Sequence, residues 1–483
     1  MPEESLKSKT VKGTFWSAAD AFLGQGVTFL VGIILARQLT PSDYGLIGLC
    51  LIFTTVLSGV VDSGFSTALI RRKDTTNADY NTMFITNMVM SVVLYFALYF
   101  SSPLIASFFE RPELVDVVRA MGLLLFFQAL SITQVTILTK KIDFKTKTKA
   151  SLFSAVISGA VGILMAYHGY GVWALVGQQL SRQLLYSLCL WVFNKWWPDW
   201  SFNCQSFRYM WGFGWKMMLS GLLNNIWSQL YSVVVGKFYS PPTLGQYSKS
   251  SEYTSLFSSN FTSIIQRVTY PVLSEVQDDS DRMVAAYRKV IKMTMFVAAI
   301  IMITLGAIAE PFIYCLIGPQ WHEAATYLPF ICLSMVLYPL HAINLNMLQV
   351  MGRSDIFLGL EILKKVLALG PLCLGIFVGI YWMLAGSVIF GCICFFLNSY
   401  YTGERLHYTS WMQIKDIAPS FCIAFIIAIA VYFIKYLSFS YWIILPLQIV
   451  VGTFVFFLIC ELRNIEEYNE LKMIVSRLFE KLH

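Results

Sequence analysis

Apolar stretches of about 20 residues, the length that a helix needs to cross a bilayer, recur along nearly the whole chain. The 483 residues are 57% hydrophobic and only 13% charged, where a soluble domain has about 25% charged residues. The stretches predict an all-α integral membrane protein of about fourteen transmembrane helices, with almost nothing left for a soluble domain. The predicted spans lie near residues 14–36, 44–69, 80–102, 115–138, 150–168, 171–193, 213–235, 250–272, 290–313, 325–348, 356–378, 381–401, 417–437 and 440–461.

The first apolar stretch is predicted to be a retained span. Three lysines precede it, but it is longer than the apolar core of a signal peptide, and no small-residue cleavage site follows it. The ten cysteines lie mostly inside apolar stretches, and Cys392 and Cys394 point to opposite sides of a helix instead of converging on a metal. No disulfide, metal site or cofactor is therefore expected.

Positive charges gather in alternate loops, with far fewer in the loops between. The rich loops hold Lys7, Lys9, Lys12, Arg71, Arg72, Lys73, Lys140, Lys141, Lys145, Lys147, Lys149, Lys195, Arg208, Arg282, Arg288, Lys289, Lys292, Arg353, Arg405, Lys415, Arg463, Lys472, Arg477 and Lys481. The positive-inside rule then predicts that both termini lie in the cytoplasm, for a multi-pass protein of a bacterial inner membrane. These topology signals and contacts with membrane lipids explain the net charge of +7, so no nucleic-acid partner is expected.

One internal repeat indicates how the spans are organised. The segment ARQLTPSDYGL at Ala36–Leu46 matches GKFYSPPTLGQ at Gly236–Gln246, six predicted spans later. An even offset keeps both copies in the same orientation, which predicts two pseudo-symmetric six-helix bundles facing each other across a cavity. The expected division is a first lobe over residues 1–200, a second lobe over 201–410, and two additional helices with a cytoplasmic tail over 411–483.

Polar side chains form stripes along a few of the predicted spans. Residues four apart lie on one face of a helix, and polar groups inside a membrane are costly, so such stripes indicate helices that face water. The alternative explanation of the stripes is that Ser, Thr and Asn pack helices together without water. Lys216 and Arg267 could instead extend to the membrane interface. Arg182 could instead form an internal salt bridge or pack between helices. The stripes comprise Thr54, Ser58, Asp62 and Ser66; Lys216, Ser220, Asn224 and Ser228, with Asn225 and Gln229 beside them; Ser248, Glu252, Ser255, Ser259, Thr262 and Gln266, with Arg267 adjacent; and Ser17, Asp20, Gly24 and Thr28.

Bases, amides and carboxylates together suit an amphiphilic anion as substrate. Arg and Lys can hold a diphosphate, amides can hydrogen-bond sugars, and a membrane carboxylate can exchange a proton during transport. The candidate binding residues for diphosphate or sugar are Arg182, Lys216, Arg267, Asn224, Asn225 and Gln229. The candidate ion-coupling residues are Asp20, Asp62 and Glu252.

Several motifs in order along the chain resemble the polysaccharide transporter family of the MOP superfamily, the Wzx-type flippases of lipid-linked oligosaccharides, and particularly their colanic-acid-like branch. They are ILARQLTPSDYGLIGL at Ile34–Leu49, GVWALVGQQL at Gly171–Leu180, YPVLSEVQDD at Tyr270–Asp279, AEPFIYCLIGPQW at Ala309–Trp321 and MGRSD at Met351–Asp355. The resemblance implies two six-helix bundles, alternating access, and movement of an undecaprenyl-diphosphate-linked oligosaccharide to the periplasmic leaflet for O-antigen, capsule or exopolysaccharide synthesis. It also implies a polysaccharide polymerase and export machinery as partners, and coupling to protons or sodium. Relatives often carry an acid shortly before VGKF, where this chain reads NNIWSQLYSVVVGKF.

Two rival functions belong to other classes. A MATE-like, cation-coupled drug exporter would more often have an aromatic, acidic cavity, whereas this chain also places bases in its spans. A membrane enzyme of the same pathway, such as a polymerase or ligase, usually carries catalytic groups on a sizeable outer loop, and the outer loops here are short. His168 and His322 have no evident nucleophile or acid beside them in the sequence, so no catalytic residue is expected.

Overall fold

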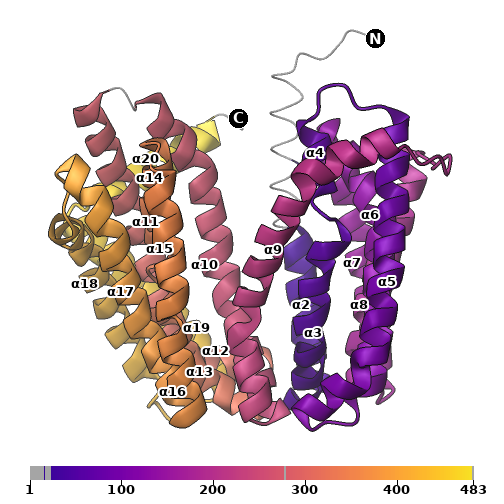
Figure 1. Ribbon diagram of the computed structural model, residues 1–483. Coiled ribbons are helices and arrows are strands. Elements are labelled where there is room, and N and C mark those ends of the chain that lie inside the picture. Colours follow the sequence, from indigo (N-terminus) through magenta and orange to yellow (C-terminus); the bar gives the residue numbers. More distant parts are fainter. Residues whose placement is uncertain (1–15, 17–22, 277–278, 481–483) are drawn as a thin grey trace. The chain divides into compact units, whose positions relative to one another are not determined.

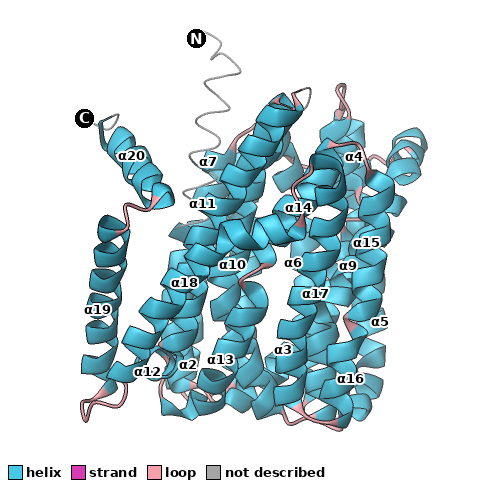
Figure 2. Cartoon of the chain, turned by 90° about the vertical axis from the view of Figure 1, so that its left-hand side faces the viewer, coloured by secondary structure: helices cyan, strands magenta, loops and turns pink. Residues whose placement is uncertain are grey.

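The computed structural model describes Trp16, residues 23–276 and residues 279–480 (Figure 1). Every regular element in these residues is a helix, and they contain no strand (Figure 2). The all-α class expected from the apolar stretches is therefore confirmed. The chain divides by its internal contacts into two compact units, Met1–Gly245 and Gln246–His483. The division near residues 200 and 410 that the sequence suggested stays a prediction.

In the first unit, α5 packs against α6 and α7 packs against α8, while α3 contacts α6, α8 and α9. Helix α3 therefore has neighbouring helices on several sides. The helices of this unit are α2 (Gln25–Gln38), α3 (Pro41–Val61), α4 (Phe65–Arg71), α5 (Asn77–Phe109), α6 (Leu114–Lys140), α7 (Phe144–Tyr167), α8 (Val172–Asn194) and α9 (Cys204–Phe238). The next helix, α10 (Pro241–Glu275), begins in the first unit and continues into the second.

In the second unit, α18 packs along α11, and α19 packs against α12 and α18. The ion pair between Arg288 and Asp416, 2.9 Å long, links α11 to α18. A short C-terminal helix, α20, was not anticipated from the sequence; its Glu470 lies 2.6 Å from Lys289 of α11. The helices here are α11 (Ser280–Ala307), α12 (Ala309–Leu316), the 3-10 helix η2 (Pro319–Trp321), α13 (His322–Met335), α14 (Tyr338–Val350), α15 (Ser354–Leu367), α16 (Leu369–Phe377), α17 (Ile380–Leu406), α18 (Ser410–Ile434), α19 (Tyr441–Leu462) and α20 (Glu466–Glu480).

Within the described residues, nine helical stretches are long and apolar enough to cross a membrane. The protein is thus a multi-pass membrane protein, and the total of fourteen spans stays a prediction. Three more helices, α8, α9 and α10, have 23, 35 and 35 residues but carry more polar side chains. Polar groups are tolerated at membrane depth where a helix faces protein or a water-filled cavity. Their composition is therefore compatible with a place inside the bundle.

Several predicted spans are interrupted in the second unit, and proline accounts for three interruptions. A proline ring clashes with the carbonyl group four residues earlier and lacks the N–H that would bond to it. Each of these helices ends four residues before a proline: Ala307 before Pro311, Met335 before Pro339, and Leu367 before Pro371.

The predicted second span is also interrupted, but without a proline. Ser63 and Gly64 between α3 and α4 have positive φ angles of 50° and 70°. Gly64 lies against α9, where a Cβ atom would come within 2.4 Å of the carbonyl oxygen of Gly214. Glycine is required there both for its backbone conformation and for this close approach. The break fixes α4 against the first half of α9.

Candidate functional site

One face of α8 carries a group of four polar side chains. The group lies on one side of the helix, because its members are one, three or four residues apart along the chain. It comprises Gln179, Arg182, Gln183 and Tyr186. All four side chains are half-buried. Because a charged side chain facing lipid is costly, the protein interior is the favourable place for this face.

This face lines a cavity of about 450 Å³ inside the first unit. Helices α3, α6 and α7 supply its other walls. Its size falls within the usual range of about 300 to 1,000 Å³ for sites that bind small molecules. The lining residues are Leu51, Thr54, Thr55 and Ser58 of α3; Leu124, Leu125 and Gln128 of α6; Ser151 and Ser154 of α7; and Gln179, Arg182, Gln183 and Tyr186 of α8.

Three hydroxyl groups of this cavity donate their hydrogens within their own helices. Ser58 Oγ donates to the carbonyl oxygen of Thr55 at 2.8 Å, and Ser154 Oγ donates to that of Ser151 at 2.9 Å. Thr54 Oγ1 donates to the carbonyl oxygen of Cys50 at 3.3 Å. A hydroxyl oxygen keeps acceptor capacity after donating its hydrogen. These groups can therefore accept hydrogen bonds from a ligand that is rich in hydroxyl donors.

The amides and the arginine supply the complementary donors. Gln183 Nε2 donates to Ser131 Oγ at 3.2 Å, which orients this amide. Among the described residues, the side chains of Gln128 and Gln179 make no hydrogen bond, so both can serve a ligand. The Arg182 guanidinium has five N–H donors in a planar fork that matches carboxylate and phosphate oxygens. The cavity thus combines one permanent positive charge with neutral donors and acceptors.

The four candidates on α9 are arranged differently. Asn225 Nδ2 donates to the carbonyl oxygen of Thr55 at 3.3 Å, so it contacts the helix that forms one cavity wall. Lys216 and Asn224 are exposed, and the Lys216 ammonium lies 6.0 Å from the centre of the Trp215 ring. Gln229 is half-buried. None of these four is among the described residues that line the cavity.

The carboxylate candidates occupy separate places. Asp62 ends α3 and accepts hydrogen bonds from the backbone N–H and the hydroxyl of Ser66, which in turn accepts one from Thr136 Oγ1 at 3.0 Å. In the second unit, Glu252 is 2.8 Å from the Nζ of Lys249, whose side chain is only 3% exposed. Asp20 and the side chain of Arg267 lie outside the described parts of the structure.

Several lining residues were not selected from the sequence. Gln179, Gln183 and Tyr186 share the helix face of Arg182, and this spacing was a signal that could have found them. Further polar lining residues that were not selected are Gln128 of α6 and Ser151 and Ser154 of α7. Only the packing of these helices brings them to Arg182, so sequence spacing could not have selected them.

Membrane-crossing helices around an open, polar cavity define a polytopic membrane protein of the transporter type. The chain belongs to the polysaccharide biosynthesis protein family, whose sequence model matches residues 34–326. The family resemblance inferred from the motifs is thereby confirmed. The chain is 24% identical to the teichuronic acid biosynthesis protein TuaB of Bacillus subtilis, over 73% of each chain. It is 23% identical to the succinoglycan biosynthesis transport protein ExoT of Rhizobium meliloti, over 80% of this chain and 78% of ExoT.

Solved structures show the same fold. The lipid II flippase MurJ in an inward closed conformation superposes with a TM-score of 0.72 at 15% identity, over 95% of this chain and 99% of MurJ. An inward-facing MATE family multidrug resistance transporter of the MOP superfamily gives a TM-score of 0.59 at 17% identity, over 81% of this chain and 99% of the transporter. The fold is therefore that of MurJ and the MATE transporters.

Proposed function

We propose that the protein is a flippase that moves an undecaprenyl-diphosphate-linked oligosaccharide from the cytoplasmic to the periplasmic leaflet of the inner membrane. The product would serve the synthesis of O-antigen, capsule or exopolysaccharide. Family membership supports a role in polysaccharide synthesis, and the fold supports transport across a membrane. The observation that carries the proposal is the polar α8 face with Arg182 around a cavity inside the membrane-spanning unit.

The chemistry of this cavity matches the two polar parts of such a substrate. Arg182 can bind diphosphate oxygens through two parallel N–H bonds, a geometry that lysine cannot offer. The hydroxyls and amides around it can exchange hydrogen bonds with sugar hydroxyls. Lys216, Arg267, Asn224, Asn225 and Gln229 are proposed as further contacts for the diphosphate or sugar.

Transport would proceed by alternating access, with the cavity exposed first to the cytoplasm and then to the periplasm. Asp20, Asp62 or Glu252 is proposed to couple this cycle to a proton or sodium gradient, since a carboxylate can change its charge or ion contact during the cycle. A polymerase and the export machinery would receive the translocated sugar chain. Both termini would remain in the cytoplasm.

The test is complementation of surface polysaccharide in a strain that lacks its own flippase, with membrane abundance measured alongside. We expect Arg182→Gln to abolish or strongly reduce complementation at normal abundance, because a charge-assisted contact contributes about 1.5 to 3 kcal/mol. Arg182→Lys should recover only part of the activity. Arg208→Gln is the matched control, because Arg208 is exposed on α9 and lies outside the cavity lining.

Three results would count against the proposal. Full complementation by Arg182→Gln would remove the cavity as the diphosphate site. Failure of the parental protein to restore polysaccharide, together with increased resistance to cationic drugs, would favour the exporter function. Accumulation of translocated but unpolymerised sugar lipid in a strain lacking this protein would instead indicate a polymerase.

A further inference from the structure

A second pocket of the first unit has a different character from the Arg182 cavity. It measures about 420 Å³ and lies where α4 ends, beside the first half of α9. It contains three bases and one carboxylate, so its formal charge is positive. The residues that matter are Arg71, Arg72, Lys73, Asp74, Tyr209 and Phe213.

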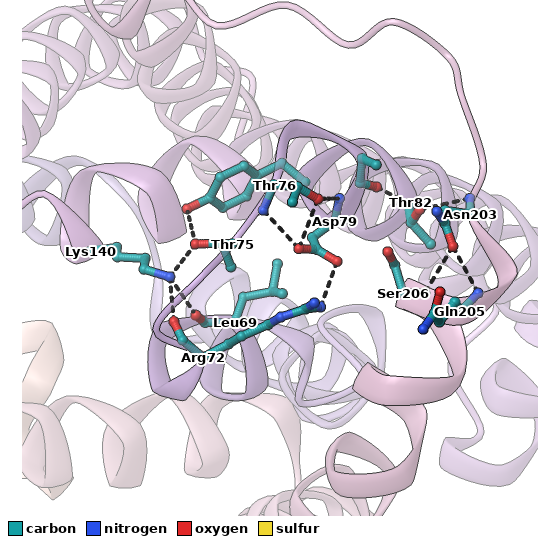
Figure 3. A network of polar contacts seen from close by, with 12 residues as sticks. Leu69, Arg72, Thr75, Thr76, Asp79, Thr82, Lys140, Asn203, Gln205 and Ser206 are labelled. Atoms are coloured by element: carbon teal, nitrogen blue, oxygen red, sulfur yellow. Dashed lines mark hydrogen bonds and ion pairs between the residues drawn. The ribbon is translucent and has the colours of Figure 1, made fainter.

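A polar network holds one wall of this pocket in place (Figure 3). Arg72 forms a 2.8 Å ion pair with Asp79, whose side chain is 1% exposed. Asp79 also closes the capping box of α5 with Thr76. Lys140 from α6 donates to the carbonyl oxygens of Leu69 and Arg72 at the end of α4. The backbone that carries the pocket bases is thus fixed from two neighbouring helices.

Aromatic rings of α9 form the opposite wall. The Arg72 guanidinium lies 4.7 Å from the centre of the Tyr209 ring, and the Arg71 guanidinium lies 5.2 Å from that of Phe213. Stacking on an aromatic face restricts the motion of a guanidinium. The N–H groups at the edge of the guanidinium plane remain available for hydrogen bonds. The close contact of Gly64 with Gly214 sets the distance between the two walls.

Among the described residues, no ion pair neutralises the charge of Arg71 or Lys73. Both side chains are exposed, and in the described residues neither has a carboxylate within ion-pair distance. Arg72, by contrast, is paired with Asp79. The pocket therefore offers two cations without an ion-pair partner among the described residues, one carboxylate, and a third cation held by Asp79. Such a site suits a compact anion with several oxygens, and phosphate fits this description.

The position of the pocket at the end of a membrane-length stretch favours a lipid as the source of the phosphate. Arg71 is the last residue of one membrane-crossing stretch, Pro41–Arg71, and the next stretch begins at Asn77. The pocket thus lies where these helices leave the apolar layer, at the level of phosphate headgroups. We infer that it binds the phosphate group of a membrane lipid on the side that the positive-inside rule assigns to the cytoplasm.

The test uses the purified full chain in dodecyl maltoside and native mass spectrometry, with three probe lipids. Phosphatidylglycerol represents a phospholipid headgroup, undecaprenyl diphosphate represents a lipid-linked diphosphate, and diacylglycerol lacks phosphate. The double variant Arg71→Gln with Lys73→Gln removes two charges from the pocket. The double variant Lys141→Gln with Lys149→Gln removes two exposed charges outside the pocket lining and is the matched control.

We expect the pocket variant to bind a phosphate lipid about tenfold more weakly, with the control and diacylglycerol binding unchanged. Weaker binding of phosphatidylglycerol by the pocket variant identifies a phospholipid site. Weaker binding of undecaprenyl diphosphate identifies a site for substrate-like lipids. Either result supports the inference. Equal losses in both double variants, unchanged binding in the pocket variant, or no phosphate-lipid binding by the parental protein would overturn it. Because Arg182 is untouched, this outcome is independent of the proposed transport function.

Discussion

Gly45 lies directly against the backbone of Pro241, so closely that a Cβ atom on Gly45 would come within 1.9 Å of the proline carbonyl oxygen. The contact is reciprocal, because a Cβ atom on Gly245 would lie 1.9 Å from the carbonyl oxygen of Pro41. These four residues are the matched positions of the internal repeat. The two copies therefore do more than begin two helices, α3 and α10: they pack against each other through their glycines.

A side chain at position 45 should destabilise the protein. We expect Gly45→Ala to lower the free energy of unfolding by about 1 to 3 kcal/mol or more, because the clash is with backbone and cannot be relieved by a rotamer change. Thermal unfolding of the detergent-purified protein measures this. Gly212→Ala is the control, since nothing lies within 4 Å of a Cβ atom there and alanine favours a helix. Equal melting temperatures for the two variants would show that the contact does not exist in the protein.

The starts of α3 and α10 also provide a test of topology. We expect Ser42→Cys and Thr243→Cys, in a variant without other cysteines, to react with a membrane-impermeant thiol reagent added outside spheroplasts. Lys141→Cys should react only after the membrane is opened, because its loop is rich in positive charge. Labelling of positions 42 and 243 only from the inside would reverse the predicted orientation.

An ion pair beside this contact should make stability depend on pH. Lys237 Nζ lies 2.8 Å from Glu110 Oε1, and the hydrogen bond and charge of Lys237 hold the pKa of this carboxyl below its usual value of 4.5. A lowered folded-state pKa gives a contribution to stability that is present above pH 4.5 and is lost as the pH falls through the folded-state pKa.

We therefore expect Glu110→Gln to melt slightly below the parental protein at pH 7, because Glu110 is exposed and the ion pair is screened. The difference should shrink below pH 4.5. Glu113→Gln, an exposed neighbour without a described ion pair, should show no such pH-dependent difference. If the melting temperature of Glu110→Gln stays below that of the parental protein at low pH, the effect comes from packing and not from charge.

The residues that could be selected from the sequence are those whose signal is local. The apolar stretches located the helices, and Arg182 stood out because a charge inside a span has few harmless explanations. The three proline breaks could not have been placed by the same reasoning, because Pro103, Pro329, Pro419 and Pro446 lie inside helices that continue unbroken.

The missing information concerns which helix faces meet. Gln128 and Ser154 become part of the Arg182 cavity only through the packing of α6 and α7 against α8. Lys216 is, like Arg182, a base inside a predicted span, yet it is exposed on α9. The α3–α4 break also depends on contact between distant segments, since Gly64 must lie against Gly214. The spacing of residues along one sequence does not show which distant segments come into contact.

Asp62 provides the last prediction, which concerns ion coupling. Its carboxylate accepts both the N–H and the hydroxyl of Ser66 where α3 ends. Asn keeps the shape and one acceptor oxygen for these bonds but cannot gain or lose a proton near neutral pH. We therefore expect Asp62→Asn to alter the pH dependence of lipid-linked oligosaccharide translocation in proteoliposomes more than it alters membrane abundance or melting temperature.

Asp116→Asn is the matched control, because the Asp116 side chain is 77% exposed and lies 4.0 Å from Arg119. It should retain the parental pH profile. Glu252→Gln should behave differently from Asp62→Asn, since it removes an ion-pair partner of the buried Lys249 and should lower stability as well. If Asp62→Asn, Asp20→Asn and Glu252→Gln each keep the parental pH profile, none of these carboxylates couples transport to protons, and the driving ion must act elsewhere in the protein.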